Sequence, residues 1–229
     1  MSESPNGIIN LNKPTGISSA RAVAIVKRLL PRGTKIGHAG TLDPFASGVL
    51  LLLVGNATKS CEALMDQPKQ YEATIKFGAT TPTEDPESEE TSWSDAVVAT
   101  RDAVQTAIPS FIGAIQQRPP VFSAMKVGGR RACDIARKGG TVELSARTVH
   151  VYGMELLDFD WPFARVRIDC GRGTYIRSIA RDLGERLNCG GYLTQLARTR
   201  IGKFTLENAT TIETLQADGV ESALEALKR

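Results

Sequence analysis

The stretch that decides most about this sequence lies at residues 37–50 and reads GHAGTLDPFASGVL. Pro44 has no backbone N–H and disfavours helical geometry for the residue before it, so Asp43 is expected in a turn. The apolar run at residues 49–54 predicts a buried strand that anchors this turn. Asp43 is thus presented on a rigid loop edge beside His38, which suits a reactive group. The alternative is an Asx-turn that only shapes the loop.

Composition allows a sizeable core. The chain has 229 residues, of which 41% are hydrophobic and 23% charged, enough for one large domain or two intimate subdomains. Its four cysteines show no Cys-Xaa-Xaa-Cys spacing, and His38 and His150 are the two histidines. These observations argue against a structural zinc site, and we predict neither a metal nor a cofactor.

The N-terminus carries no targeting signal that we recognise. Residues 1–7 lack a basic start and an apolar h-region, and no apolar run approaches membrane-spanning length. We therefore expect a soluble, cytoplasmic protein that does not associate with membranes.

Charge is segregated along the chain, although the net charge is only +3. Residues 113–150 carry seven basic and two acidic side chains, and residues 164–203 carry nine and three. Residues 81–102 carry seven acidic side chains and one basic one. This distribution favours a surface with one phosphate-facing side, and solvated helix faces are the alternative.

Hydrophobic periodicity predicts a mixed α and β chain without solenoid or propeller repeats. Residues 80–94 are expected to form a flexible loop, and a proline pair and paired glycines delimit a basic excursion. Strands are expected at residues 7–11, 49–54, 70–77, 149–160, 163–170 and 192–199, and helices from residue 18 or 19 to 31 and at 56–65, 94–111, 130–137 and 174–187.

Four further blocks accompany GHAGTLDPFASGVL at 37–50, namely NKPTGISS at 12–19, KQYEA at 69–73, RPPVFSAMK at 118–126 and GRGTYIRS at 171–178. Together the five blocks resemble the TruB family of tRNA pseudouridine synthases. One short block arises by chance, but five blocks in the family's order are specific. The resemblance extends from about residue 7 to residue 203.

The resemblance implies the pseudouridine synthase fold, an α+β architecture whose mixed, mainly antiparallel central sheet is flanked by helices. Residues 1–229 are expected to form a single catalytic domain, with an inserted basic, thumb-like RNA-gripping segment at residues 113–148. Members of the family commonly carry a small C-terminal RNA-binding domain. We expect no separate domain of this kind, because the chain ends soon after a short acidic segment.

The implied activity is isomerisation of uridine to pseudouridine at position 55, in the T loop of tRNA, with Asp43 as the catalytic carboxylate. Pseudouridine formation breaks a glycosidic bond and reattaches uracil through C5 without redox change. Asp43 could attack C1′ of the ribose or C6 of the uracil, or remove the C2′ proton in a glycal route, and the sequence leaves the three open.

The resemblance also assigns the other pocket residues. Arg177 is expected to hold the Asp43 carboxylate in its charged form. Tyr71 is expected to lie against the target uracil and to serve as a general base or acid late in the reaction, with a core tyrosine as the alternative. Substrate contacts are implied for His38, Tyr175 and Leu196, and a supporting role for Lys13. Asp85 matches a family aspartate in a mobile loop, but the glycine that follows it in the family is absent here. RNA contacts are expected from Arg118, Lys126, Arg130 and Arg131.

The expected partner is the T arm of tRNA, recognised by its shape and by a flipped base. No protein partner is predicted. Two other functions compete with this hypothesis: a non-catalytic RNA-binding or RNA-folding protein, and a metal-dependent hydrolase with an aspartate nucleophile. The combination of Asp43, Tyr71 and Arg177 disfavours the first, and the lack of carboxylates next to Asp43 disfavours the second.

Overall fold

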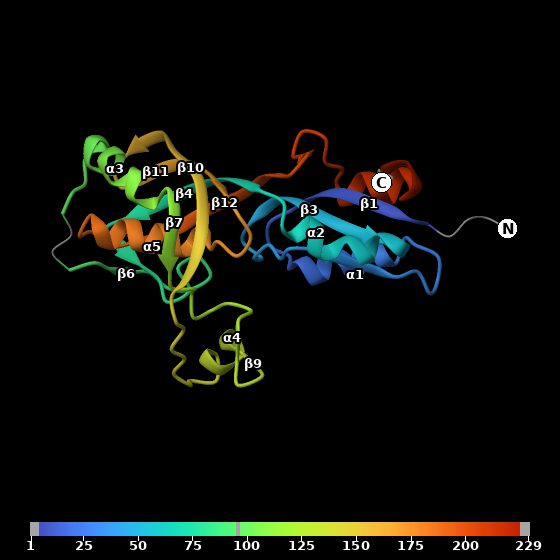
Figure 1. The fold of residues 1–229 in the computed structure, drawn as a ribbon, viewed down its shortest axis with the longest axis horizontal. Coiled ribbons are helices and arrows are strands. Elements are labelled where there is room, and N and C mark those ends of the chain that lie inside the picture. Colours follow the sequence, from blue (N-terminus) through green and yellow to red (C-terminus); the bar gives the residue numbers. More distant parts are fainter. Residues whose placement is uncertain (1–4, 95–96, 225–229) are drawn as a thin grey trace. The chain divides into compact units, whose positions relative to one another are not determined.

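The structure is a computed structural model that describes residues 5–94 and 97–224 (Figure 1). It divides into two compact units. Unit 1 contains the described residues up to Tyr71 and from Leu196 onward, and unit 2 is Glu72–Gln195. Two strands, β4 (Lys69–Phe77) and β12 (Gly191–Ile201), cross from one unit into the other along the chain.

Strand β3 (Ser47–Val54) is the centre of unit 1. It pairs antiparallel with β1 (Gly7–Lys13) and with β2 (Ile36–Ala39), and the end of β12 pairs parallel with its first two residues. A short strand, β13 (Phe204–Thr205), completes the sheet against β12. The predicted strand at 49–54 is confirmed, and its continuous apolar sequence is explained because both faces are buried.

Helices cover the sheet of unit 1. Ser18 caps α1 (Ser19–Lys27) by accepting a hydrogen bond from the backbone N–H of Arg21, as predicted. The predicted helix at 56–65 consists of a 3₁₀ helix, η1 (Gly55–Ser60), followed by α2 (Cys61–Met65). Two further elements follow β13, namely α6 (Ile212–Asp218) and η3 (Glu221–Ala223). One core cluster contains Ile8, Ala39, Val49, Leu51, Leu53, Ala57, Leu64, Ile201 and Phe204.

Unit 2 is built on a sheet with the strand order β12-β4-β11-β10-β7. The predicted hairpin of β10 (Arg147–Asp160) and β11 (Phe163–Cys170) is confirmed, and β7 (Gly113–Gln117) pairs antiparallel with β10. Helix α5 (Ile176–Arg186) lies beside α3 (Arg101–Ala107), which continues into η2 (Ile108–Phe111) and packs on β10 (Figure 1). The α+β class with a mixed, mainly antiparallel sheet is confirmed.

Two local predictions in unit 2 were wrong. The helix predicted at 94–111 begins only at Arg101, because the Thr100 side chain caps it by accepting a hydrogen bond from the N–H of Ala103. Residues 97–98, which were expected on the buried face of this helix, are exposed. Residues 95–96 lie outside the described residues. The loop predicted at 80–94 contains a small ribbon of β5 (Ala79–Thr80) and β6 (Thr91–Ser92) and buries one carboxylate, Asp85.

The inserted segment (113–148) projects from this sheet at the ends of β7 and β10 (Figure 1). Its tip, residues 118–146, contains the hairpin of β8 (Lys126–Val127) and β9 (Arg130–Arg131), followed by α4 (Ala132–Ala136). Gly128 and Gly129 both have positive φ, as a two-residue hairpin turn requires. Gln117 and Arg147 are paired strand residues, so the roots of the tip are held side by side.

Candidate active site

Asp43 begins a hydrogen-bonded turn. Its carbonyl accepts from the N–H of Ala46 at 3.1 Å, and Pro44 occupies the second position, where its fixed φ is favourable. The side chain is partly exposed, whereas the flanking Leu42 and Ala46 are buried. The turn therefore presents a carboxylate at the edge of an apolar anchor, as the sequence predicts.

The backbone around Asp43 is held by side chains distant in sequence. The Ser19 hydroxyl accepts from the N–H of Leu42 at 2.8 Å and donates to its carbonyl at 3.0 Å. The N–H of Gly16 donates to the carbonyl of Pro44 at 2.8 Å. Lys13, fully buried, donates through Nζ to the carbonyls of residues 14 and 17, so it supports the segment that contacts Pro44.

Arg198 is the main support of this loop, and sequence reasoning missed it. Its side chain is 1% exposed, and its guanidinium donates to the carbonyls of Val49 (2.8 Å), Gly40 (3.1 Å) and Thr41 (3.4 Å). The parallel pairing of β12 with β3 places Arg198 opposite Gly48. The available signal was an arginine in a strand that also carries Arg200, and without the strand pairing neither arginine can be assigned a position.

His38, Tyr71 and Leu196 lie in unit 1 together with Asp43. Tyr71 is 7% exposed, and the Arg198 guanidinium lies 6.0 Å from its ring centroid. Burial lowers the pKa of His38, and the nearby positive charge of Arg198 lowers it further, so the imidazole is neutral at pH 7. Leu196 is buried on β12.

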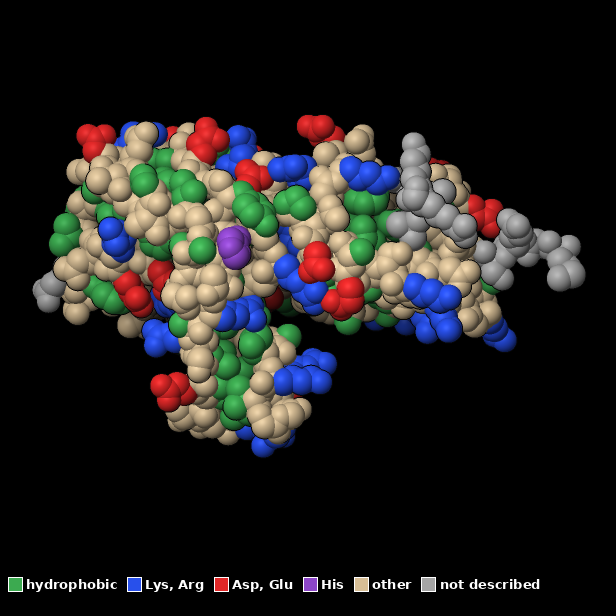
Figure 2. Space-filling model, in the orientation of Figure 1, with side chains coloured by type: hydrophobic (Ala, Val, Ile, Leu, Met, Phe, Trp, Pro, Cys, Tyr) green, Lys and Arg blue, Asp and Glu red, His purple; other side chains and the backbone are tan. Residues whose placement is uncertain are grey.

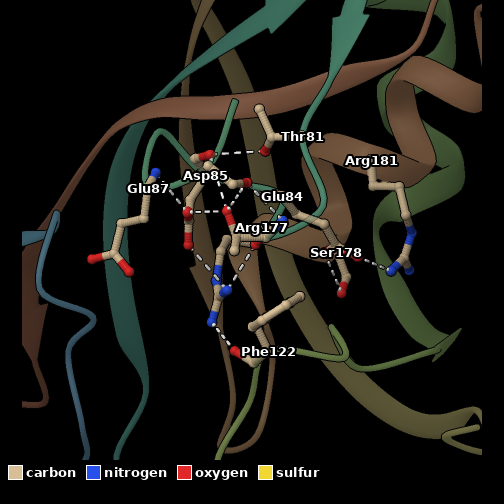
Figure 3. Close-up of polar contacts among 10 residues, drawn as sticks. Thr81, Glu84, Asp85, Glu87, Phe122, Arg177, Ser178 and Arg181 are labelled. Carbon is tan, nitrogen blue, oxygen red and sulfur yellow. Dashed lines mark hydrogen bonds and ion pairs between the residues drawn. The ribbon is translucent and has the colours of Figure 1, made fainter. Parts of the chain in front are cut away.

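Arg177 lies in unit 2 and binds the acidic loop, which is the segment at residues 81–90 between β5 and β6 (Figure 3). Its side chain is 5% exposed, and its guanidinium donates to Asp85 Oδ2 at 3.1 Å, to the carbonyl of Thr83 at 2.8 Å and to that of Phe122 at 3.1 Å. Asp85 Oδ1 accepts from the Thr83 hydroxyl at 2.6 Å and from the N–H of Glu87 at 3.0 Å. Asp85 is thus a partner of Arg177, an ion pair that sequence reasoning did not foresee.

A second ion pair lies beside the first. Glu84 Oε1 contacts Arg181 Nη1 at 2.5 Å, and Glu84 Oε2 accepts from the Ser178 hydroxyl at 3.3 Å (Figure 3). Burial raises the pKa of the Glu84 carboxyl, although the Arg181 charge opposes this shift. Both pairs tie the acidic loop to the first turns of α5.

Tyr175 immediately precedes α5 and is partly exposed. The four basic residues expected to contact RNA, Arg118, Lys126, Arg130 and Arg131, are all exposed. Figure 2 shows Lys and Arg side chains on several sides of the tip, with apolar side chains between them. Within residues 5–94 and 97–224, no three His, Cys, Asp or Glu side chains are placed to hold a metal ion, and no helix is long and apolar enough to cross a membrane.

Comparison with known proteins assigns the family. Residues 27–176 match the family model "TruB family pseudouridylate synthase (N terminal domain)", and residues 177–228 match "tRNA pseudouridylate synthase B C-terminal domain". A tRNA pseudouridine synthase B from Cupriavidus metallidurans is 45% identical over 219 residues, covering 95% of this chain and 69% of the relative. One from Phocaeicola vulgatus is 48% identical over 189 residues, covering 82% and 80%.

Solved structures agree with this assignment. A chain in the crystal structure of a Cbf5-Nop10-Gar1 complex matches with a TM-score of 0.71 and 30% identity over 95% of this chain. A chain in an H/ACA RNP bound to a substrate RNA matches with a TM-score of 0.70 and 27% identity over 96% of this chain. The protein spans 57% and 59% of those two chains. It is an enzyme with the predicted pseudouridine synthase fold, and the chain belongs to the TruB family of pseudouridylate synthases.

Proposed function

We propose that this enzyme isomerises uridine to pseudouridine at position 55, in the T loop of tRNA, and that Asp43 is the catalytic carboxylate. Family membership supports the reaction, and the names of the curated relatives support tRNA as the substrate. The proposed location is the cytoplasm. No protein partner is proposed.

The observation that carries the role of Asp43 is the support of its turn. Ser19 holds the residue before it, Gly16 the residue after it, and Arg198 the loop that leads to it. Such preorganisation is what a reacting group requires, because a displacement of about 1 Å can cost 100-fold in rate.

In the proposed reaction the C1′–N1 bond breaks, C1′ bonds to C5, and the hydrogen on C5 leaves as a proton while N1 gains one. Asp43 acts in its ionised form, whether on C1′, on C6 or on the C2′ hydrogen. Tyr71 is proposed to lie against the target uracil and to act as a general base or acid late in the reaction, and His38, Tyr175 and Leu196 are proposed to contact the substrate uridine.

Arg177 is proposed, as the resemblance implies, as the cation that keeps the catalytic carboxylate charged when the substrate binds. What supports this role is that its guanidinium is desolvated and oriented by two backbone carbonyls; the carboxylate that it pairs with in this structure is Asp85. The exposed bases Arg118, Lys126, Arg130 and Arg131 are proposed to contact RNA phosphates.

The test is tritium release from a T-arm RNA whose uridine carries tritium at C5, without added metal. Asp43→Asn is expected to abolish release while RNA affinity stays within a few-fold, because the carboxylate serves chemistry rather than phosphate binding. The matched control is Asp218→Asn, an exposed carboxylate at the end of α6 in the same unit, which is expected to retain wild-type turnover.

Turnover near the wild-type rate in Asp43→Asn would mean that Asp43 only shapes its loop, as the Asx-turn alternative holds. RNA binding by the wild type without tritium release would favour an RNA-binding or RNA-folding protein.

A further inference from the structure

We propose that Gln117 is a positioning residue, which fixes Tyr175 and Arg177 and connects them to the roots of the inserted segment (113–148). The proposal rests on the proposed function, in which Tyr175 and Arg177 serve the uridine pocket. All residues involved lie in unit 2.

The Gln117 carboxamide makes two hydrogen bonds to one residue. Its Oε1 accepts from the N–H of Tyr175 at 2.8 Å, and its Nε2 donates to the carbonyl of Tyr175 at 3.0 Å. The side chain has 0% exposure, so water does not compete for either bond. A planar amide that binds both the N–H and the C=O of one residue engages the two peptide groups on either side of its Cα, and so fixes the position and the orientation of that residue's backbone.

The held residue is the start of α5. Tyr175 is the N-cap position, and its own side chain does not cap the helix. Arg177 follows two residues later, in the first turn of α5, so the position of its guanidinium depends on the direction in which the helix begins. Gln117 therefore acts on both pocket residues through one backbone position.

The other root of the tip contacts the same stretch. Arg147, paired with Gln117 across the two strands, donates through Nη2 to the carbonyl of Gly173 at 2.6 Å. Its guanidinium lies 5.3 Å from the ring centroid of Tyr175. The two strand ends from which the tip projects thus hold residues 173–175 between them.

The first residues of the tip continue this contact with α5. The carbonyl of Arg118 accepts from Arg181 Nη2 at 2.9 Å and lies 3.0 Å from the Ser178 hydroxyl, whose one proton it shares with Glu84 Oε2. The carbonyl of Phe122 accepts from Arg177 Nη2 at 3.1 Å. A displacement of the tip root is therefore transmitted to Tyr175 and Arg177, with Gln117 as a fully buried link.

Two substitutions weaken these bonds to different extents. Gln117→Leu removes both. In Gln117→Glu, burial raises the pKa of the introduced carboxyl, so the neutral acid still accepts from the N–H of Tyr175 and has one O–H that can donate to its carbonyl, in altered geometry. We expect Gln117→Leu to lower kcat per folded molecule by about 10- to 100-fold and to leave KM for T-arm RNA within about threefold, because the exposed bases of the tip are unchanged. Gln117→Glu is expected to lie between Gln117→Leu and the wild type.

Amide hydrogen exchange measured by NMR gives a readout independent of turnover. The N–H of Tyr175 is expected to lose protection in Gln117→Leu and to keep more of it in Gln117→Glu. Gln116→Glu is the matched control, because Gln116 is the exposed neighbour on β7 and its side chain donates to the Thr148 hydroxyl at 2.9 Å, away from Tyr175. The control is expected to keep wild-type kcat and wild-type protection of Tyr175.

The proposal is overturned if folded Gln117→Leu keeps wild-type kcat, or if its lower activity follows only from a smaller folded fraction. If Gln117→Leu does not fold, Gln117→Glu carries the same two measurements. A wild-type enzyme that releases no tritium refutes the proposed function, whereas active wild type with unchanged Tyr175 protection in both variants refutes the role of Gln117.

Discussion

Gly48 is the position at which the support of the Asp43 loop can be tested by stability. Its φ is +103°, a conformation that residues with a Cβ rarely adopt. A Cβ at this position would lie 2.3 Å from the carbonyl oxygen of Arg198 and 2.9 Å from its backbone nitrogen. Both atoms belong to the backbone of the paired strand, so no side-chain rotation relieves the contact.

The magnitude follows from two separate costs. A left-handed conformation costs a residue with a Cβ roughly 1–2 kcal/mol, and overpacking against a fixed neighbour costs roughly 1–3 kcal/mol. Gly48→Ala is therefore expected to lower the free energy of unfolding by roughly 2–5 kcal/mol. Because the strand that must yield carries Arg198, we also expect lower tritium release per folded molecule.

Urea unfolding of three alanine variants separates these costs. Gly16 has φ +83° with no atom within 4 Å of a built Cβ, so Gly16→Ala is expected to lose only the conformational part, roughly 1–2 kcal/mol. Gly37 has open space and no left-handed φ, and Gly37→Ala should leave stability unchanged or raise it by up to about 1 kcal/mol. If Gly48→Ala were no less stable than Gly16→Ala, the close approach of β12 to β3 would not constrain this loop.

Three further predictions concern charge. Arg177→Lys keeps the charge but loses the planar fork that reaches one carboxylate and two carbonyls. The rate of tritium release should fall at least tenfold, which corresponds to the loss of about one to two charged hydrogen bonds. Full activity would mean that Arg177 has a structural or phosphate-binding role instead. Four exposed basic residues of the tip can be neutralised, namely Arg118, Lys126, Arg130 and Arg131. Their neutralisation should weaken RNA binding and make its salt dependence shallower, by about one unit of slope or less per lost contact. An unchanged affinity together with an unchanged slope would mean that the RNA binds elsewhere. Folding lowers the pKa of His38, so the unfolded chain binds the proton more tightly, and the free energy of unfolding should fall as the pH drops below 6.5 towards the folded-state pKa. Urea unfolding at several pH values should show that His38→Asn flattens this part of the stability profile. A flat wild-type profile, or equal flattening by the control His150→Asn at an exposed position, would refute the assignment.

Local sequence determined the elements whose cause is local. The apolar run after Asp43 predicted β3, the Asp-Pro pair predicted the turn, and the alternation of β4 placed Tyr71 on the buried side. These predictions succeeded because strand burial and turn geometry depend on neighbours within a few residues. The helix predicted from residue 94 failed because a capping threonine, rather than the apolar spacing, sets its start.

The residues that hold the site became visible only in the tertiary structure. Arg198, Gln117 and the pairing of Asp85 with Arg177 join positions separated by 58 to 158 residues. No periodicity encodes such contacts, because they depend on which strands pair and in which register. The sequence alone therefore determined which chemical groups are available and the turn that presents Asp43, whereas strand pairing decided what holds that turn and the start of α5 in place.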